Sequence, residues 1–523
     1  METYIAGKDS SFRIKSCCRF RVLLFLLWNY LASGDWGLKD MGRSYFDEVK
    51  KKAKVIDTMN VEFYTPIVKN SLCETQSTNS EYTACQPGQK KLNILVVDQL
   101  PVMATQLGCG KRMFHLLEAI IGLGHTISLS YLRPDKHETP TDVALVEKLG
   151  VPVLRSPLLV NNVKEDYRQV ILEVQPDVVI FTLWYWQPDK PWFNVPGLFM
   201  TYTRKAHPGI KVVVLTDDVH WLRLQMLSMY KTESGATTNS KNAMSPEAAV
   251  TAIRMSEYAN YGAADAVITI SLTDKESIIK YDTDKVVGRP EKLFVVPFVA
   301  SPWETIKENV IAPFNTRSGL IFVGNMVNPT NIEGLKWFLQ QVLPMLIDRD
   351  PAIRITIVGG GGWTIDGVEP IGPIRFVGWL SWEQMRQELN SAKVFVSPIV
   401  VSTGVNTKNA LAMSNGIPLV TTSIGASGLC NRCDESPVPL DESLDSSGSG
   451  GLQLPPDVEC PFVTAQDVSE FARAVMQLYK DELLWNMFSK RGLQNIDEYL
   501  SVRNEAKEFE KVVSYVFEPP LDE

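Results

Sequence analysis

Basic residues are not in excess in this chain. Lys and Arg together number 52 against 60 Asp and Glu, which leaves a formal net charge of −8 at pH 7. Proteins that bind nucleic acid normally carry a basic patch that neutralises phosphates. The composition therefore argues against a nucleic-acid partner.

Long apolar runs are also missing. The run Val22–Trp28 is shorter than the roughly 20 residues that a membrane-spanning helix needs. Four basic residues between Arg13 and Arg21 precede it, and the small-residue segment up to Gly34 follows. This order is typical of a signal peptide or a short signal anchor, here residues 1–36. The alternative is a basic amphipathic surface helix.

Residues 37–90 are polar in their second half and are interpreted as a stalk or linker. The signal-like segment predicts the secretory pathway, with the protein in the lumen or anchored to the membrane through its N-terminus. The chain has no Asn-x-Ser/Thr acceptor for N-linked glycans, so a cytoplasmic location remains the alternative.

Metal-binding patterns are absent as well. No Asp-x-Asp follows a predicted strand, and all five His precede Val250. Cys430 and Cys433 form half of a zinc site, but only Cys460 lies near them, so a four-ligand set is lacking. We predict no metal and no cofactor, and leave open either a disulfide involving Cys460 or free thiols.

What the chain does have is length and a series of short apolar runs. With 523 residues and 45% hydrophobic content, it can bury more than one core, so two or three domains are expected. Near-continuous apolar runs are typical of strands buried in parallel sheets. They occur at 92–98, 177–182, 211–216, 293–297, 394–397 and 419–422.

A polar loop follows the predicted strand Val394–Ser397 and leads into a predicted helix, Thr407–Ser414, which Gly416 and Pro418 end. A helix N-terminus carries unpaired N–H groups and a partial positive charge, so this junction, with Lys408 inside the helix, suits a phosphate or pyrophosphate. The alternative is an ordinary strand-to-helix connection with an exposed Lys. We call residues 398–409, which are this loop and the first three residues of the helix, the cassette loop.

A second glycine-containing loop, Gly108–Arg112, is predicted ahead of a helix that starts at Met113. It is not a P-loop, because Thr105 stands where the first Gly belongs and Arg112 replaces the hydroxyl residue. A turn that merely needs Gly is the alternative. His125, at the end of that helix, is interpreted as structural.

Polar residues also follow the predicted strand 211–216. Asp217, Asp218 and His220 lie beyond its carboxyl end, where open α/β sheets bind ligands. They could hydrogen-bond the polar groups of a ligand or accept a proton. Alternatively, Asp217 or Asp218 caps a helix that begins near Val219.

The cassette loop and its helix resemble the donor-site signature of the retaining glycosyltransferase family four (glycosyl transferases group 1). The matching residues are Gly404, Lys408, Ala412, Gly416 and Pro418, and the likeness extends from about Lys91 to Tyr499. It implies an α/β fold of the GT-B type, in which two Rossmann-like domains face each other across a cleft. Residues 91–300 would form the acceptor domain and 301–499 the donor-binding domain, with an insertion at 430–460. Residues 500–523 would cross back as a helix.

The resemblance also assigns roles. Lys408 would assist the leaving group, and Asp218 and His220 would face the acceptor and the transferred sugar. The donor would contact Gly108, Gly110, Arg112, Gly324, Asn325, Thr403, Gly404, Val405, Asn406, Thr407 and Asn409. Retention by front-face attack, without a metal or an enzymatic nucleophile, is implied as well.

The chain departs from the family pattern at several positions. Thr403 and Leu411 occupy the places of two glutamates, and Asn325, Asn331 and Asn406 replace basic residues. An amide can hydrogen-bond phosphate but lacks the charge that strengthens such a contact. Either the donor is held differently, with Asn406, Thr407 and Asn409 as substitutes, or the site does not turn over.

The sequence therefore predicts a glycosyltransferase that moves a sugar from a nucleoside-diphosphate sugar to a glycan, a lipid or another acceptor. Fold alone does not fix function. An inactive relative that binds sugars and a sugar-nucleotide epimerase are the alternatives.

Overall fold

The computed structural model describes residues 91–104, 108–132, 139–154, 163–182, 195–233, 245–300, 311–402, 404–430 and 460–517. The predicted signal segment and stalk, most of the 430–460 insertion, and Thr403 lie outside the described residues. Cys430 is disulfide-bonded and Cys460 is buried. None of the helices within the described ranges is long and apolar enough to cross a membrane.

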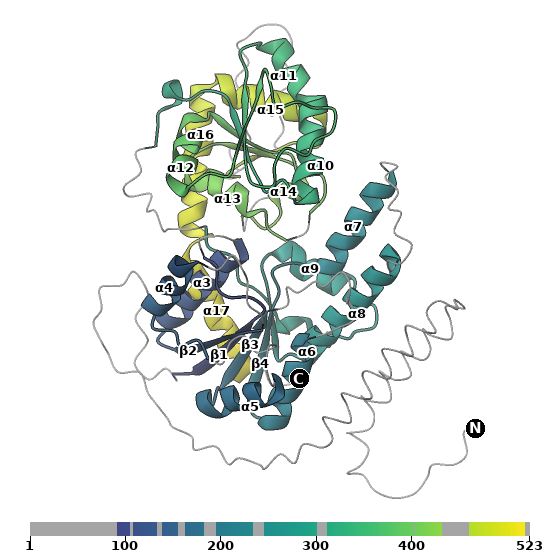
Figure 1. Ribbon diagram of the computed structural model, residues 1–523, viewed down its shortest axis with the longest axis vertical. Helices are drawn as coiled ribbons and strands as arrows, with labels where there is room; N and C mark the ends of the chain where they lie inside the picture. Colours follow the sequence, from purple (N-terminus) through teal and green to yellow (C-terminus); the bar gives the residue numbers. More distant parts are fainter. Residues whose placement is uncertain are drawn as a thin grey trace, which may run out of the picture. The chain divides into compact units, whose positions relative to one another are not determined.

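The first domain is built on a parallel sheet in which the described strands follow the order β2-β1-β3-β4-β5-β6 (Figure 1). The strands are β1 Asn93–Asp98, β2 Thr126–Tyr131, β3 Val178–Thr182, β4 Lys211–Leu215, β5 Ala266–Thr269 and β6 Leu293–Val295. Side chains alternate between the faces of a strand. Accordingly, Ile94 and Val96 belong to one hydrophobic cluster, and Leu95 and Val97 belong to another. Both faces are therefore covered, as a parallel sheet requires.

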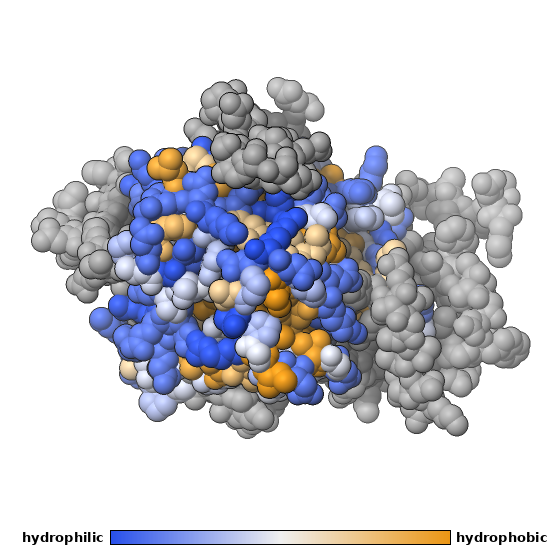
Figure 2. Space-filling model, turned by 90° about the horizontal axis from the view of Figure 1, so that it is seen from above, coloured by the Kyte–Doolittle hydropathy of each residue, from blue (hydrophilic) through white to orange (hydrophobic). Residues whose placement is uncertain are grey.

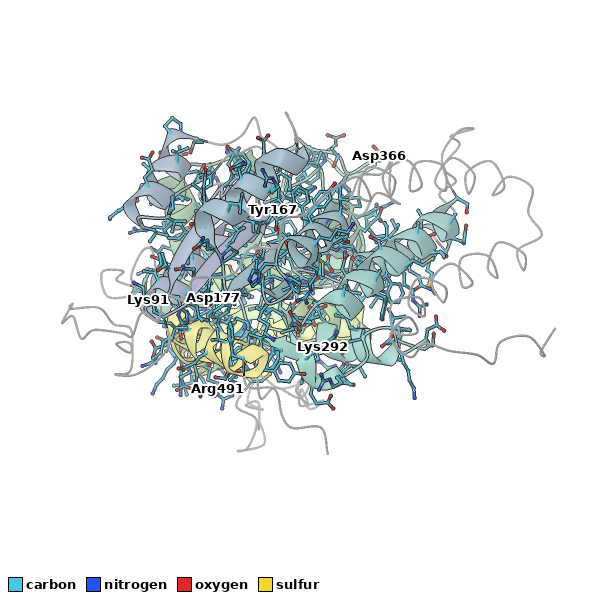
Figure 3. All side chains as sticks on the ribbon, turned by 90° about the horizontal axis from the view of Figure 1, so that it is seen from below. Lys91, Tyr167, Asp177, Lys292, Asp366 and Arg491 are labelled. Carbon is cyan, nitrogen blue, oxygen red and sulfur yellow. The ribbon has the colours of Figure 1, made fainter. Side chains whose placement is uncertain are left out.

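Helices cover the two faces of this sheet. They are α3 Gly108–Gly122, α4 Pro140–Lys148, α5 Val163–Val174, α6 Val195–Ala206, α7 His220–Glu233, α8 Pro246–Ala263 and α9 Leu272–Lys280, with a short turn η1 Pro290–Lys292. Their ends are marked by local signals. Thr139 and Asp142 form a capping box on α4, and Ser271 caps α9. Lys292, labelled in Figure 3, donates to the carbonyl oxygens of Gly262 and Ala264 at the end of α8.

The second domain contains a second parallel sheet, whose described strands follow the order β12-β11-β10-β7-β8-β9. The strands are β7 Leu320–Val323, β8 Ile355–Val358, β9 Ile374–Gly378, β10 Val394–Ser397, β11 Leu419–Thr421 and β12 Val463–Thr464. The helical elements are η2 Phe314–Thr316, α10 Pro329–Trp337, the π-helical η3 Phe338–Val342, α11 Leu343–Arg349, α12 Trp382–Ser391, α13 Thr407–Ser414, α14 Ser423–Ala426, α15 Val468–Lys480 and α16 Glu482–Glu498. Within β10, Val394 and Val396 face one cluster and Phe395 faces the other.

The last helix, α17 Val502–Phe517, packs on the first domain although it follows the second domain in sequence. Val502, Ala506 and Phe509 belong to the same cluster as buried residues of α3 and as Ile94 and Val96 of β1. Its Tyr515 ring lies 5.2 Å from that of Phe294, edge to face. Helix α17 therefore belongs structurally to the first domain.

The surface carries large apolar side chains among polar ones, as Figure 2 shows for one face of the molecule. The most exposed large apolar side chains within the described ranges are Leu483, Trp379, Ile371 and Val327, with exposed fractions of 67% to 83%. Isolated exposed apolar residues are normal on soluble surfaces.

Candidate active site

The strand order of the second sheet identifies a ligand-binding edge. The chain runs from β7 to β8 and β9 on one side, then returns to β10 beside β7 and continues to β11 and β12 on the other side. Ligands of open parallel sheets bind beyond the carboxyl ends of the strands at such a switch point. The loops after β7 and β10 begin there, and these contain the predicted donor residues Gly324 and Asn325 and the cassette loop.

Lys408 lies in the first turn of α13, which has the bounds that the sequence predicted. Its ammonium group donates to Oδ1 of Asn331 and lies 5.0 Å from the ring centre of Phe322. Although the residue is partly exposed, burial of its ammonium group lowers the pKa to about 7. No carboxylate among the described residues forms an ion pair with it. A cation without an acidic partner at a helix N-terminus is suited to an anionic ligand.

Asn331 holds the loop after β7 against Lys408. Its Nδ2 donates to the carbonyl oxygen of Asn325 at 2.9 Å. Gly324 has no room for a side chain, because a Cβ there would lie 2.9 Å from Cγ of Asn331. The Asn325 side chain accepts from the backbone N–H of Val327 at 3.1 Å, so it stabilises its own turn.

The remaining cassette residues divide into buried and exposed positions. Asn409 is completely buried, and its Nδ2 donates to the carbonyl oxygen of Gly425 at 2.7 Å. Asn406 is 8% exposed and its Nδ2 donates to the Ser402 hydroxyl at 3.5 Å, while Thr407 is exposed. The Asn409 side chain therefore stabilises the turn after β11.

The predicted glycine loop of the first domain is helical, which corrects the expectation for Gly108–Arg112. Helix α3 begins at Gly108 rather than at Met113. Tertiary packing explains the difference: a Cβ on Gly110 would lie 2.4 Å from the carbonyl oxygen of Met103, so the glycine permits close approach inside the helix.

Arg112 is 3% exposed and already has protein partners. Its guanidinium group donates to the carbonyl oxygens of Thr216 and Val296, each at 3.3 Å, and pairs with Asp217. A donor phosphate that used Arg112 would have to share it with Asp217.

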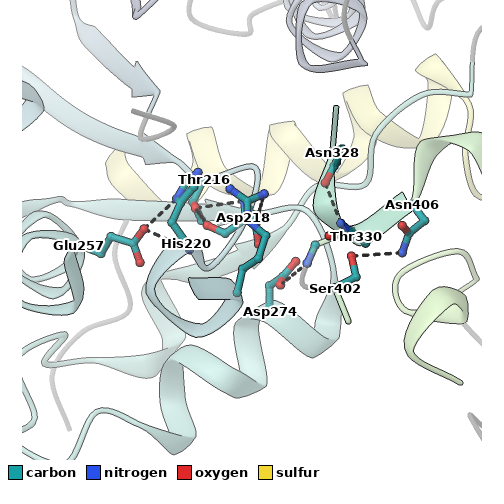
Figure 4. Close-up of polar contacts among 11 residues, drawn as sticks. Thr216, Asp218, His220, Glu257, Asp274, Asn328, Thr330, Ser402 and Asn406 are labelled. Atoms are coloured by element: carbon teal, nitrogen blue, oxygen red, sulfur yellow. Dashed lines mark hydrogen bonds and ion pairs between the residues drawn. The ribbon is translucent and has the colours of Figure 1, made fainter. Parts of the chain in front are cut away.

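Asp218 and His220 lie together beyond β4, as predicted, and each has a charged partner (Figure 4). Asp218 pairs with Arg223. Nδ1 of His220 lies 2.7 Å from Oε1 of Glu257, which also accepts from the His220 backbone N–H at 3.2 Å. Burial by itself lowers the pKa of His220, but the hydrogen bond and charge of Glu257 outweigh it and raise the pKa.

Glu257 was not predicted as a site residue. The sequence does contain a signal for it. Glu257 lies four residues after Ile253 and four before Tyr261, which places its carboxylate on the buried face of α8. Glu257 accepts the first backbone N–H of α7. It therefore caps this helix, a role for which the sequence had suggested Asp217 or Asp218.

Asp274 is a further buried carboxyl group that sequence reasoning missed. Its Oδ1 accepts from the backbone N–H of Gly404 in the cassette loop at 3.3 Å, and its Oδ2 accepts from the Ser271 hydroxyl at 2.7 Å. Burial and the nearby charge of Asp218 raise its pKa to about 7. The residue thus joins the first domain to the cassette loop.

The family model for "Glycosyl transferases group 1" matches residues 317–481. Residues 317–481 are therefore similar to the group 1 glycosyltransferases. This region contains the switch point, Asn331, Lys408 and the whole cassette loop. This match confirms the predicted resemblance to glycosyl transferases group 1, while retention of configuration stays a prediction.

A curated protein from Klebsiella pneumoniae, described as an uncharacterised 44.6 kDa protein in the cps region, is 32% identical over 133 residues. The match covers 24% of this chain and 34% of that protein, so it spans about a third of the relative.

Solved structures resemble the chain over a much larger part. A glycosyltransferase from Rickettsia africae has a TM-score of 0.50 and 10% identity, covering 82% of this chain and 99% of its own. HepE of Anabaena, solved with UDP and glucose, has a TM-score of 0.49 and 12% identity, covering 81% and 99%. Together with the two parallel sheets, the Rickettsia structure confirms the GT-B fold for the group 1 glycosyltransferase domain and its partner domain.

Proposed function

We propose that the protein transfers a sugar from a nucleoside-diphosphate sugar to a glycan, a lipid or another hydroxyl-bearing acceptor. The observation that best supports this proposal is the environment of Lys408. It is a cation without a described acidic partner, it stands at a helix N-terminus on the switch point, and it lies inside a group 1 glycosyltransferase domain.

The chemistry that we propose follows from the charge of the leaving group. When the bond between the anomeric carbon and the diphosphate oxygen breaks, negative charge grows on the diphosphate. Donors aimed at that charge lower the barrier more than they tighten substrate binding. Lys408 and the first N–H groups of α13 would serve as these donors. The acceptor oxygen forms the new bond to the anomeric carbon, and its proton passes to the departing diphosphate.

We propose retention of configuration by front-face attack, in which the acceptor oxygen approaches from the side that the diphosphate leaves, so that no enzymatic nucleophile is needed. We also propose that no metal is required, because Lys408 and the N–H groups of α13 would offset the charge of the diphosphate. Asp218 and His220 would bind hydroxyl groups of the acceptor or of the transferred sugar. Arg223 and Glu257 hold these two side chains in place.

A second candidate function is sugar-nucleotide binding without turnover. Leu411 favours it, since this residue replaces a family glutamate and packs against the apolar cluster of the domain. The pairing of Arg112 with Asp217 points the same way. Acceptor-dependent release of nucleotide distinguishes the two functions.

The proposed location, in the secretory pathway or at a membrane, rests on residues 1–36 alone. A fusion of these residues to a reporter protein tests it. Export or membrane retention of the reporter supports the proposal, and a cytosolic reporter contradicts it.

The proposed function is tested by a thermal-shift panel of UDP-, GDP- and ADP-sugars on the full chain. A ligand that binds the native state raises its melting temperature. We expect one nucleotide class to stabilise the wild type and to lose this effect in Lys408→Ala. Lys336→Ala, an exposed lysine of α10, is the matched control and should keep the shift. If no nucleotide sugar stabilises the wild type, the proposal is wrong.

A further inference from the structure

Two glycines of the second domain touch the first domain directly. Gly404 has a φ of +69°, and a Cβ on it would lie 3.0 Å from the carbonyl oxygen of Asp217. Gly428 has a φ of +71°, and a Cβ there would lie 2.6 Å from Cβ of Ser271 and 2.5 Å from Cγ2 of Val405. Real Cβ atoms essentially never approach as closely as the contact at Gly428, and the contact at Gly404 is tighter than most, so both glycines allow a close approach of the other domain.

Asp274 supplies a polar contact across the same boundary. It stands at the third position of α9, where Ser271 caps its backbone N–H at 3.1 Å and donates to its Oδ2. These bonds fix the carboxyl group on the first domain. The other oxygen, Oδ1, accepts from Gly404, three residues before α13 begins, and the side chain is only 4% exposed.

The groups that surround Asp274 come from several elements. Asp218 and Arg112 act on it electrostatically from the first domain, while Ser271 and Gly404 reach it by hydrogen bonds. Hydrogen bonds to a charged or partly charged carboxyl group are stronger than neutral ones. An enclosed bond of this kind resists competition from water.

We propose that Asp274 is a positioning residue that holds the cassette loop against the first domain. It acts through Gly404, and so fixes the entrance of α13 and Lys408 relative to Asp218 and His220. Gly404 and Gly428 are the steric part of the same contact. The effect on sugar transfer rests on the proposed function, whereas the contact itself can be tested without it.

The first test is hydrogen–deuterium exchange of the full-length chain without ligand, read in peptides that contain Gly404. In Asp274→Ala we expect the Gly404 amide to exchange about tenfold faster than in the wild type, because its acceptor is gone. Asp274→Asn retains an acceptor oxygen and should restore most of the protection.

The matched control is Asp142→Ala. Asp142 is also a buried carboxylate at the third position of a helix, bonded to the hydroxyl of its N-cap Thr139, but it belongs to α4. The Asp142→Ala variant should lower the stability of the fold without changing hydrogen–deuterium exchange of the Gly404 amide. Equal exchange at Gly404 in the wild type and in Asp274→Ala would overturn the proposal.

The steric part is tested by Gly428→Ala, with Asp274 intact. We expect the Gly404 amide to lose protection, because the new Cβ meets Ser271 and Val405. Gly372→Ala is its control: Gly372 has a similar φ of +63°, with no atom within 4 Å of a Cβ, so it carries the backbone strain alone. If both alanine variants change Gly404 exchange equally, the steric contact is refuted.

Transfer kinetics then connect the contact to the reaction, with the donor that the nucleotide panel identifies. Asp274→Ala should lower kcat about tenfold while donor binding changes little, since Lys408 and Asn331 belong to the second domain. If the exchange results hold and no transfer is found, the proposed function fails and the contact stands. If transfer occurs and Gly404 exchange does not respond, the positioning role fails.

Discussion

Lys408 is a residue whose charge depends on the pH at which the protein works. In the empty site its pKa is lowered to about 7 by burial, so above that pH the amine is neutral. Binding of a nucleoside diphosphate then requires uptake of a proton. We predict that the affinity for UDP, GDP or ADP, whichever binds, falls by up to about tenfold per pH unit above pH 7.

Isothermal titration calorimetry between pH 6.5 and 8.5 measures this dependence, together with the proton uptake. Lys408→Arg is the matched variant, because a guanidinium group stays charged over this range. It should bind with little pH dependence. The same slope in Lys408→Arg as in the wild type would show that another group titrates.

Glu257 is predicted to set the protonation of His220. Since the glutamate raises the pKa of the histidine above its ordinary value of 6.5, Glu257→Gln should lower that pKa. The charged pair stabilises the fold below pH 6.5, where His220 is protonated, and loses this contribution as the pH rises through the raised pKa of His220. Burial raises the pKa of Glu257 as well, so protonation of the glutamate limits the contribution at acidic pH. The loss of stability in Glu257→Gln, relative to the wild type, should therefore be larger at pH 5.5 than at pH 8.5.

An NMR titration of the His220 ring, with melting curves at pH 5.5 and 8.5, checks both effects. His125→Gln is a suitable comparison, because burial lowers the pKa of that histidine to about 4 and it should not affect His220. An unchanged His220 pKa in Glu257→Gln would contradict the assignment.

Single residues were predictable from sequence where the signal is local. Lys408 was selected as a candidate because a polar loop, a helix start and a family motif coincide in one short stretch, and its role stays a prediction. Glu257 and Asp274 were missed because their roles come from contacts with His220 and with Gly404, which lie far away in sequence. A carboxylate on a buried helix face indicates a partner but does not identify it.

At the scale of elements, close packing of α10 on β10 depends on one glycine. A Cβ on Gly334 would lie 1.9 Å from the carbonyl oxygen of Pro398, directly after β10. Alanine is normally the better helix former by about 1 kcal/mol. Here we expect Gly334→Ala to destabilise the protein by about 1–3 kcal/mol, because the helix must move off the strand.

Chemical denaturation of the full chain measures this difference. Gly492→Ala, in α16, is the control, since its Cβ would lie 3.3 Å from the Met413 side chain and only a small adjustment is needed. A neutral or stabilised Gly334→Ala would mean that α10 and β10 are not packed as described.

Elements were predicted well wherever burial dominates. Continuous apolar runs marked several of the described strands, although β2 Thr126–Tyr131 and β12 Val463–Thr464 were not among them. Helix α13 has its predicted bounds because a loop, an apolar face and Gly416 define it locally. The start of α3 was wrong because glycines in Gly108–Arg112 indicated a loop. In the structure Gly110 serves close packing against Met103, which a sequence pattern does not distinguish from a turn.

At the scale of the molecule, α17 brings a buried carboxyl group into the first domain. Glu505 is 1% exposed, and neither of its carboxyl oxygens has a hydrogen-bond partner among the described residues. Burial raises its pKa well above the ordinary value of 4.5, although the charge of Arg112 opposes the shift. Such a group favours the folded state less and less as the pH rises above 4.5.

We therefore predict that Glu505→Met stabilises the protein at pH 8, by about 1–3 kcal/mol, and by less at pH 5. Urea denaturation at both pH values checks this. Glu508→Met is the comparison on the same helix; Glu508 pairs with Lys511 near the surface, so its removal should have a small effect. A Glu505→Met variant that is less stable at pH 8 would show that the carboxylate has a stabilising partner.

The two-domain architecture was predictable because the family motif, the number of apolar runs and the length of the chain agree. Contacts such as Asp274 with Gly404 were not, because they depend on how loops from two separate sheets meet. Thr403 and Leu411 show the limit of motif reasoning for activity. The sequence identifies the missing glutamates, but only a measurement decides whether the remaining residues turn over the donor.

The most direct test of the central claim is release of nucleoside diphosphate from the donor that the binding panel identifies, with and without a mixture of glycan and lipid acceptors. We expect release that depends on the acceptor and is lost in Lys408→Ala but not in Lys336→Ala. Donor binding without acceptor-dependent release from any mixture would contradict transfer and leave a protein that binds nucleotide sugars without using them.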